Sequence, residues 1–341
     1  MRGAAILLAG VLAAAVLGAG GYTALWFSGA SEAKARITAW ADGVRTAGYD
    51  VEIGDIAVSG FPGPAELKIT GLDIGLPSAK LPWVWRADTV LVAATDNRLE
   101  LRLAAEHVLT VSVGGQDRTY RMAARRFQVD VGADGDGNPL LQFDIRGMFV
   151  DRGASGRLTV DRAEVFVNVA PGPGLLPDDS RILLSLANLV LPEHRRGPLG
   201  DTISVLRTEL RLDGDIDNLD LATALPDWRN RDGRLVLGES RVSWGTLEMD
   251  TRGGSLALDD DLKPTGGFSG IITGYEITID AFQAAGRFTA EDMANIRAMM
   301  SFIRQQGRMG GGIGLPVSIR EGRVRVGDAV LGTVPRLLPT D

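Results

Sequence analysis

The feature that most constrains the fold of this chain is a repeated alternation of apolar and polar residues. Apolar residues occupy every second position in segments 49–53, 67–69, 72–76, 99–103 and 109–113. Such alternation places the apolar side chains on one face of a β-sheet. Further strands are expected at 126–131, 140–150, 156–169 and 203–212. Because 44 glycines and 15 prolines also favour short strands joined by turns, the predicted fold class is mainly β with a few helices.

Four similar phrases begin at Gly156, Gly233, Gly254 and Gly322. Each combines a turn glycine with an alternating strand. The phrases are interpreted either as four ordinary hairpin edges or as parts of a meandering sheet built from similar hairpins. Their irregular spacing argues against a strict solenoid.

Three segments are predicted to be helical. In segment 33–48 one helical face carries Ala33, Ile37, Trp40, Ala41 and Val44, and Gly48 ends the helix. This helix is expected to pack Trp40 on the sheet, with contact to a membrane surface as the alternative. A second helix is predicted at 178–191 from the spacing of Ile182, Leu183, Leu186, Leu189 and Val190. A third is predicted at 289–305.

Residues 1–30 are predicted to anchor the chain in a membrane. Segment 3–27 carries no charge, and its length matches the roughly 20 apolar residues that span a bilayer as a helix. Tyr22, Trp26 and Phe27 cluster at its far end, where aromatic rings favour the membrane interface. A cleavable signal peptide is the alternative, because residues 28–30 are small.

Residues 31–341 are predicted to form an exported β-rich domain. The expected location is the inner membrane, crossed once, with this domain in the periplasm. Lys34 and Arg36 oppose Arg2 in a count of flanking positive charges, so the inverted topology stays open. Prolines and glycines concentrate near 171–200, which is the candidate boundary if the sheet has two halves.

Composition and motifs give no support for catalysis, a cofactor, a metal or a nucleic-acid partner. The net charge is -7, with arginines scattered among acidic residues. There is no cysteine, and the two histidines, His107 and His194, lack the spacing of metal or nucleophile partners. Each histidine is therefore assigned a structural or solvated role, with His107 adjoining a strand. Segment 134–138 begins like a calcium loop but lacks its glycine and glutamate, and it is predicted to be a tight turn.

Glycine, proline and tryptophan positions recur over nearly the whole chain after the anchor. They include the Gly-Phe-Pro turn at 60–62, the Gly-Tyr-Asp-Val phrase at 48–51, Leu-Pro-Trp at 81–83, Trp85, Trp244-Gly-Thr-Leu, and the phrases at 254–259, 322–327 and 332–335. With these positions the chain resembles an uncharacterised bacterial family, domain of unknown function 2125. Such positions specify shape more than chemistry, so the resemblance implies a fold and no reaction.

By architecture this family is similar to the AsmA-like inner-membrane proteins, which have an anchor, a periplasmic β-sheet groove and a suggested part in lipid traffic. The resemblance implies a large antiparallel sheet that is curved or forms a groove, with an apolar face that shelters acyl chains. The residues singled out for this groove are Phe61, Pro62, Leu67, Ile69, Trp83 and Trp85. Packing in an ordinary core is the alternative for them.

Three functions are weighed. The first is a membrane-anchored β-groove protein that binds or passes a lipid or other amphiphile, which predicts an apolar concavity. The alternative is an envelope structural or assembly factor that contacts other envelope proteins, which predicts an exposed patch and no ligand cavity. An undetected hydrolase is the third, and it requires polar groups that converge in one cleft.

Overall fold

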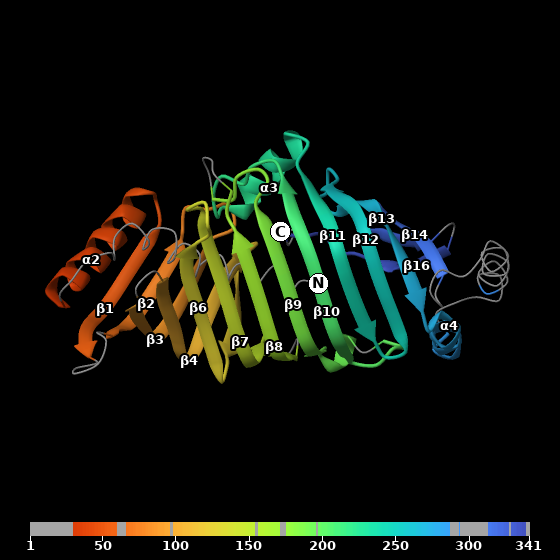
Figure 1. Ribbon diagram of the computed structural model, residues 1–341, viewed down its shortest axis with the longest axis horizontal. Helices are drawn as coiled ribbons and strands as arrows, with labels where there is room; N and C mark the ends of the chain where they lie inside the picture. The colour runs from red at the N-terminus through yellow and green to blue at the C-terminus, as the bar shows by residue number, and fades with distance from the viewer. Residues whose placement is uncertain are drawn as a thin grey trace.

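Strands dominate the computed structural model, which describes residues 30–59, 66–95, 98–153, 156–170, 175–195, 197–286, 293, 313–326 and 329–338. Within these residues, 16 strands form one antiparallel sheet (Figure 1). The strands are β1 (Asp50–Ser59), β2 (Glu66–Leu76), β3 (Trp83–Thr95), β4 (Arg98–Val113), β5 (Gln116–Ala123), β6 (Arg126–Ala133), β7 (Pro139–Asp151), β8 (Arg157–Asn168), β9 (Arg181–Val190), β10 (Thr202–Asp213), β11 (Arg234–Trp244), β12 (Leu247–Leu258), β13 (Pro264–Thr273), β14 (Ile313–Arg320), β15 (Arg323–Val326) and β16 (Ala329–Thr333). The predicted mainly β class with a large antiparallel sheet is confirmed.

The sheet is a meander in which nearly every strand pairs with the next along the chain. The exception is the position between β4 and β7, which β5 and β6 share. One part of β4 pairs with β6 and the other part pairs with β5. The strands after Gly156, Gly233 and Gly322 all belong to this meander. Gly254 differs, because it lies inside β12 at a register shift and not in a turn.

Helix α2 (Ala30–Thr46) confirms the first predicted helix. Its residues Ile37, Trp40 and Ala41 are buried in the large hydrophobic cluster, as their helical spacing predicts. The helix ends before Gly48, whose φ of 93° is a left-handed conformation that glycine adopts without strain.

The predicted helix at 178–191 is wrong, because this segment contains strand β9. β9 pairs with β8 on one side and with β10 on the other. Its buried residues Leu186 and Leu189 are three positions apart, a spacing that is typical of a helix. The spacing arises because Asn188, with φ 51°, changes which residues point inward within an extended strand.

Two further helices have no counterpart in the sequence analysis. They are α3 (Leu221–Asn230) and α4 (Tyr275–Ala284). Helix α3 lies in the connection between β10 and β11 and buries Trp228, whose indole N–H donates to the Asp213 and Gly214 carbonyls. A short 3-10 helix, η2 (Glu193–Arg195), precedes β10.

Some predicted segments fall outside the described residues. The helix predicted at 289–305 lies outside them apart from Met293, and the predicted anchor lies outside them up to residue 29. Where the structure describes the chain, its helices are too short or too polar to cross a membrane. Near 171–200 the strands β8, β9 and β10 are paired with one another in the same sheet.

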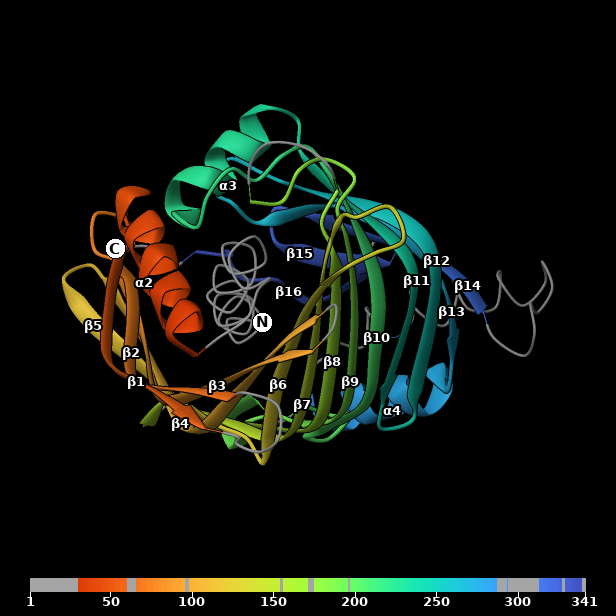
Figure 2. The ribbon, with the colours of Figure 1, turned by 60° about the vertical axis from the view of Figure 1, so that its left-hand side comes forward.

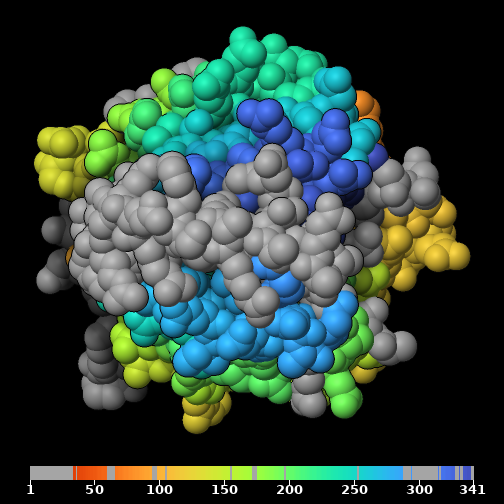
Figure 3. Space-filling view, turned by 90° about the vertical axis from the view of Figure 1, so that its right-hand side faces the viewer, coloured from red at the N-terminus to blue at the C-terminus, as the bar shows by residue number. Residues whose placement is uncertain are grey.

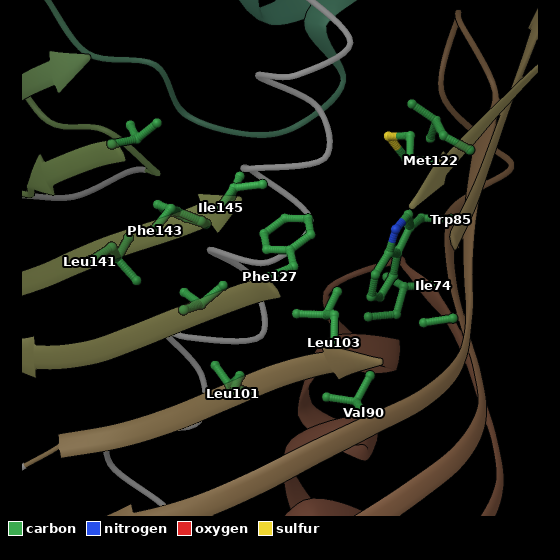
Figure 4. Packing of buried hydrophobic residues seen from close by; sticks show 14 of the residues in the cluster. Ile74, Trp85, Val90, Leu101, Leu103, Met122, Phe127, Leu141, Phe143 and Ile145 are labelled. Carbon is green, nitrogen blue, oxygen red and sulfur yellow. The ribbon is translucent and has the colours of Figure 1, made fainter. Parts of the chain in front are cut away.

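The sheet is curved, and its buried side chains lie on the concave face. Figure 2 shows the strands curving around a common interior, with α2 and α3 on its open side. In Figure 4, Trp85 points toward Phe127 and Leu103 from another part of the sheet. One hydrophobic cluster covers this face from α2 and β1 to α3 and the end of β12.

A second, smaller cluster lies at the C-terminal end of the sheet. It is formed by Ile272, Tyr275, Val317 and Val326, from β13, α4, β14 and β15. Figure 3 views this end of the molecule, with α4 and the last strands toward the reader.

A line of irregular positions crosses the sheet and keeps apolar residues on the concave face. On five strands the buried residues step by three at this line and not by two: Ile69 to Leu72, Ala87 to Val90, Ile145 to Met148, Val160 to Ala163, and Leu186 to Leu189. The registers on both sides place the skipped positions opposite one another in neighbouring strands. We name this line the crease and define it by Gly54, Gly71, Asp88, Gly147, Asp161 and Asn188.

The crease has a structural consequence for the whole sheet. A shift of one residue in a strand reverses the faces of all later side chains. Because every strand on the crease shifts at the same place, the apolar residues on both sides of it share one face. Irregular positions of this kind also bend strands and increase their twist. The crease therefore contributes to the curvature of the sheet.

Substitution of Gly71 tests the crease. Gly71 has φ 61°, a conformation that costs other residues about 1–2 kcal/mol. Gly71→Ala is expected to lower the free energy of unfolding by about 1 kcal/mol in urea denaturation. Gly135→Ala is the control, because Gly135 lies in an exposed turn where an added Cβ meets no atom within 4 Å. Equal unfolding free energies for the two variants would contradict the role of the crease.

Candidate functional site

Four of the six predicted groove residues lie on the concave face of β2 and β3. Leu67, Ile69 and Trp85 are buried, and Trp83 is half-buried against the same cluster. The leucine and isoleucine lie on one side of the crease and the two tryptophans on the other, as the β2–β3 register shows. Outside the described residues are Phe61 and Pro62. The four described residues thus share one apolar face but do not meet at one point.

This apolar face continues onto β9, β10 and β11, where half-buried side chains accompany a few buried ones. Its half-buried members there are Ile182, Leu184, Ile203, Leu206 and Leu235. The opposite face of the sheet carries cross-strand ion pairs, for example Arg86 with Asp73 and Arg241 with Asp250. The two faces of the sheet therefore differ strongly in polarity.

His107 is the unusual polar residue on the concave side. It belongs to β4, and only 1% of its surface is exposed. The Trp85 ring stacks on it at a centroid distance of 6.0 Å, and the Phe127 ring meets it edge-on at 5.3 Å. Neither ring nitrogen has a hydrogen-bond partner among the described residues. The expectation that His107 merely adjoins a strand is wrong, whereas His194 is exposed in η2.

The environment of His107 favours its neutral form. Burial lowers the pKa of its imidazole from 6.5 to about 4, although the nearby Asp88 carboxylate acts in the opposite direction. Leaving a buried polar group without a partner costs about 1–3 kcal/mol. His107 therefore lowers the stability of the protein in the state that the structure describes.

The Asp134 carboxylate makes ordinary structural contacts. Asp134 accepts hydrogen bonds from the backbone N–H groups of Asp136 and Asn138, both at 2.9 Å, and these bonds lower the pKa of its carboxyl. The predicted tight turn at 134–138 is thus confirmed. In the described part of the chain, no three His, Cys, Asp or Glu residues are grouped as a metal site.

The chain gives one sequence signal for the buried histidine. His107 is in phase with Leu109, Val111 and Val113, which form one of the alternating segments. That phase predicts an inward side chain. The lack of a hydrogen-bond partner depends on the neighbouring strands and has no signal in the sequence.

His107 is expected to make the protein less stable in acid. Between pH 6.5 and about 4 the unfolded chain binds more protons at this residue than the folded protein does. The part of the free energy of unfolding that depends on neutral His107 is therefore fully present above pH 6.5, and it is lost as the pH falls toward 4. From pH 7 to pH 4.5 the expected loss is about 2 kcal/mol. The His107→Phe variant lacks this loss and is expected to be no less stable at pH 7.

Urea unfolding of both proteins at the two pH values measures this difference. Protonation of carboxylates with lowered pKa values, such as those of Asp134 and Asp151, also destabilises the protein in acid. Both proteins contain these carboxylates, so their effect cancels in the comparison. The same pH dependence in wild type and variant would contradict a buried, neutral His107.

Comparison with known proteins identifies a family without a described activity. Searches of curated proteins and of solved structures each found no match. Residues 26–335 match the family described as "Uncharacterized protein conserved in bacteria (DUF2125)". This match covers nearly the whole chain and confirms the resemblance drawn from the glycine, proline and tryptophan positions. The chain belongs to the DUF2125 family.

Proposed function

We propose that the protein binds a lipid or other amphiphile along the concave face of its sheet. The observation that carries this proposal is the continuous apolar face, on which half-buried side chains of β9–β11 pack against the buried cluster. Acyl chains are recognised mainly by apolar surface, since burial of such surface is non-directional. A polar outer face with cross-strand ion pairs is compatible with an aqueous surrounding.

The dimensions and energies agree with an acyl ligand. Strand β9 has 10 residues and therefore spans roughly 33 Å, which is longer than one acyl chain, since the roughly 30 Å hydrocarbon core of a bilayer holds two opposed leaflets. Each buried methylene contributes about 0.8 kcal/mol, so about ten contribute roughly 8 kcal/mol before the cost of association. This gain is of the same order as the cost of association, about 4–15 kcal/mol, so apolar contact supplies the main favourable term.

The proposed location is the inner membrane, with the β-domain in the periplasm. This part of the proposal is supported by the uncharged segment 3–27, whose length suits a single span. It is also supported by the architectural analogy to AsmA-like proteins. A tethered domain of this kind would act on amphiphiles close to the membrane surface.

Contact with another envelope protein is the second candidate function. It is favoured by two exposed apolar side chains, Ile277 on α4 and Val330 on the edge strand β16, which are 61% and 42% exposed. An edge strand and an exposed apolar patch are common docking features.

Adjacent residues on β10 give a matched test of lipid binding. Leu206 packs against the concave cluster, whereas Val205 is 37% exposed and, next to it along the strand, points to the other face. The full chain is purified, incubated with vesicles of phosphatidylethanolamine and phosphatidylglycerol, and analysed by native mass spectrometry. We expect bound phospholipid at a defined stoichiometry in wild type and Val205→Glu, and at least a tenfold loss of occupancy in Leu206→Glu.

Circular dichroism and urea unfolding verify that both variants are folded. Equal lipid occupancy in the two variants would place any bound lipid away from the concave face. A folded wild-type protein without bound lipid would contradict the proposed function and favour the protein-contact candidate.

A further inference from the structure

His107 lies where the pairing of β4 changes from β6 to β5. The β4–β6 pairing ends at Arg102, and the β4–β5 pairing begins at Glu106. Leu103 and His107 are both buried, and the register of β3 with β4 shifts between them. His107 pairs with Ala87, the residue next to Asp88 of the crease, so it lies beside the crease on this strand.

The surroundings of His107 are apolar and adaptable. Its neighbours in register are Ala87 on β3 and Met122 on β5. Alanine occupies little space, and methionine is an unbranched, flexible side chain that readily changes its packing. Figure 4 shows Met122 and Trp85 on the same side of the interior. Met122 is itself buried, so contact between a ligand and the ring requires Met122 to move aside.

A neutral imidazole selects a particular kind of ligand atom. It has one N–H donor and one acceptor nitrogen. The nearest charged group that acts on it is the Asp88 carboxylate, which disfavours an additional negative charge. The fitting partner is an uncharged oxygen that accepts a hydrogen bond.

We propose that His107 is the polar contact of the amphiphile site, and that its imidazole N–H donates a hydrogen bond to the ester carbonyl of an acyl lipid. This inference rests on the proposed function, because it names the group of the ligand that the concave face recognises. The hydrogen bond satisfies a buried group that has no partner among the described residues. The acyl chain then extends along the apolar face.

The two histidines of the chain make a direct test practicable. Full-length protein is labelled with 15N only at histidine, and His194→Gln assigns the two imidazole signals. Methyl palmitate, which has an ester, and hexadecane, which has none, are added in the same detergent. We expect methyl palmitate to shift the imidazole nitrogens of His107 and not those of His194, whereas hexadecane leaves both unchanged.

Variants of His107 test selectivity by native mass spectrometry with the same two probes. In His107→Phe, the preference for methyl palmitate over hexadecane is expected to fall about fivefold to tenfold, the value of one hydrogen bond. His107→Gln keeps a donor and an acceptor and is expected to retain most of the preference. It also serves as the control if the phenylalanine variant fails to fold.

The outcomes separate this inference from the proposed function. Methyl palmitate that binds without changing the His107 signals, or with the same preference in all variants, would overturn the inference and leave the proposed function intact. Absence of binding by both probes would overturn the proposed function itself. Tighter binding of palmitate, with protonation of His107, would also overturn the inference, since the recognised group would then be an acid.

Discussion

The structure depends on one constraint: a long meander must keep its apolar side chains on a single face while the sheet bends. Strict alternation satisfies this constraint only in an unbroken strand. Here the strands shift phase together at the crease, and the Asn188 amide donates to the Asp161 carboxylate across two of them at 3.0 Å. The shared shift helps to unite side chains from α2, from strands between β1 and β12, and from α3 in one hydrophobic cluster. Curvature and a continuous apolar face thus have the same origin.

Much of this architecture could be predicted from alternation alone. The expected strands at 126–131, 140–150 and 203–212 match β6, β7 and β10 closely, because each strand carries its own period-two pattern. The crease also leaves a trace in the sequence, since the phase changes between Ile69 and Leu72. In β9 the same phase change misleads the prediction. When the paired strands are unknown, the step from Leu186 to Leu189 cannot be distinguished from the spacing of a helix. The strands that pair with this segment decide between helix and strand, and a single sequence does not identify those strands.

The candidate site shows the same division. The apolar pattern predicts that Leu67, Ile69 and Trp85 share a face, and the structure places them there. It does not predict that the face continues onto β9–β11, because part of that region has the pattern of a helix. His107 is inward by its phase, but its isolation follows from Ala87 and Met122 on neighbouring strands. The apolar period of one strand does not predict which side chains of neighbouring strands surround a given residue.

In the proposed function, affinity and selectivity have separate physical sources. The apolar face would act through its area and treat every hydrocarbon chain alike, because the hydrophobic effect has no direction. A single buried hydrogen-bonding group has the reverse properties, since it contributes little net affinity but penalises any ligand that leaves it without a partner. The described residues offer His107 no partner, whereas a phenylalanine at this position would need none. A residue that lowers stability while facing an otherwise apolar interior is better explained by recognition of a ligand than by packing.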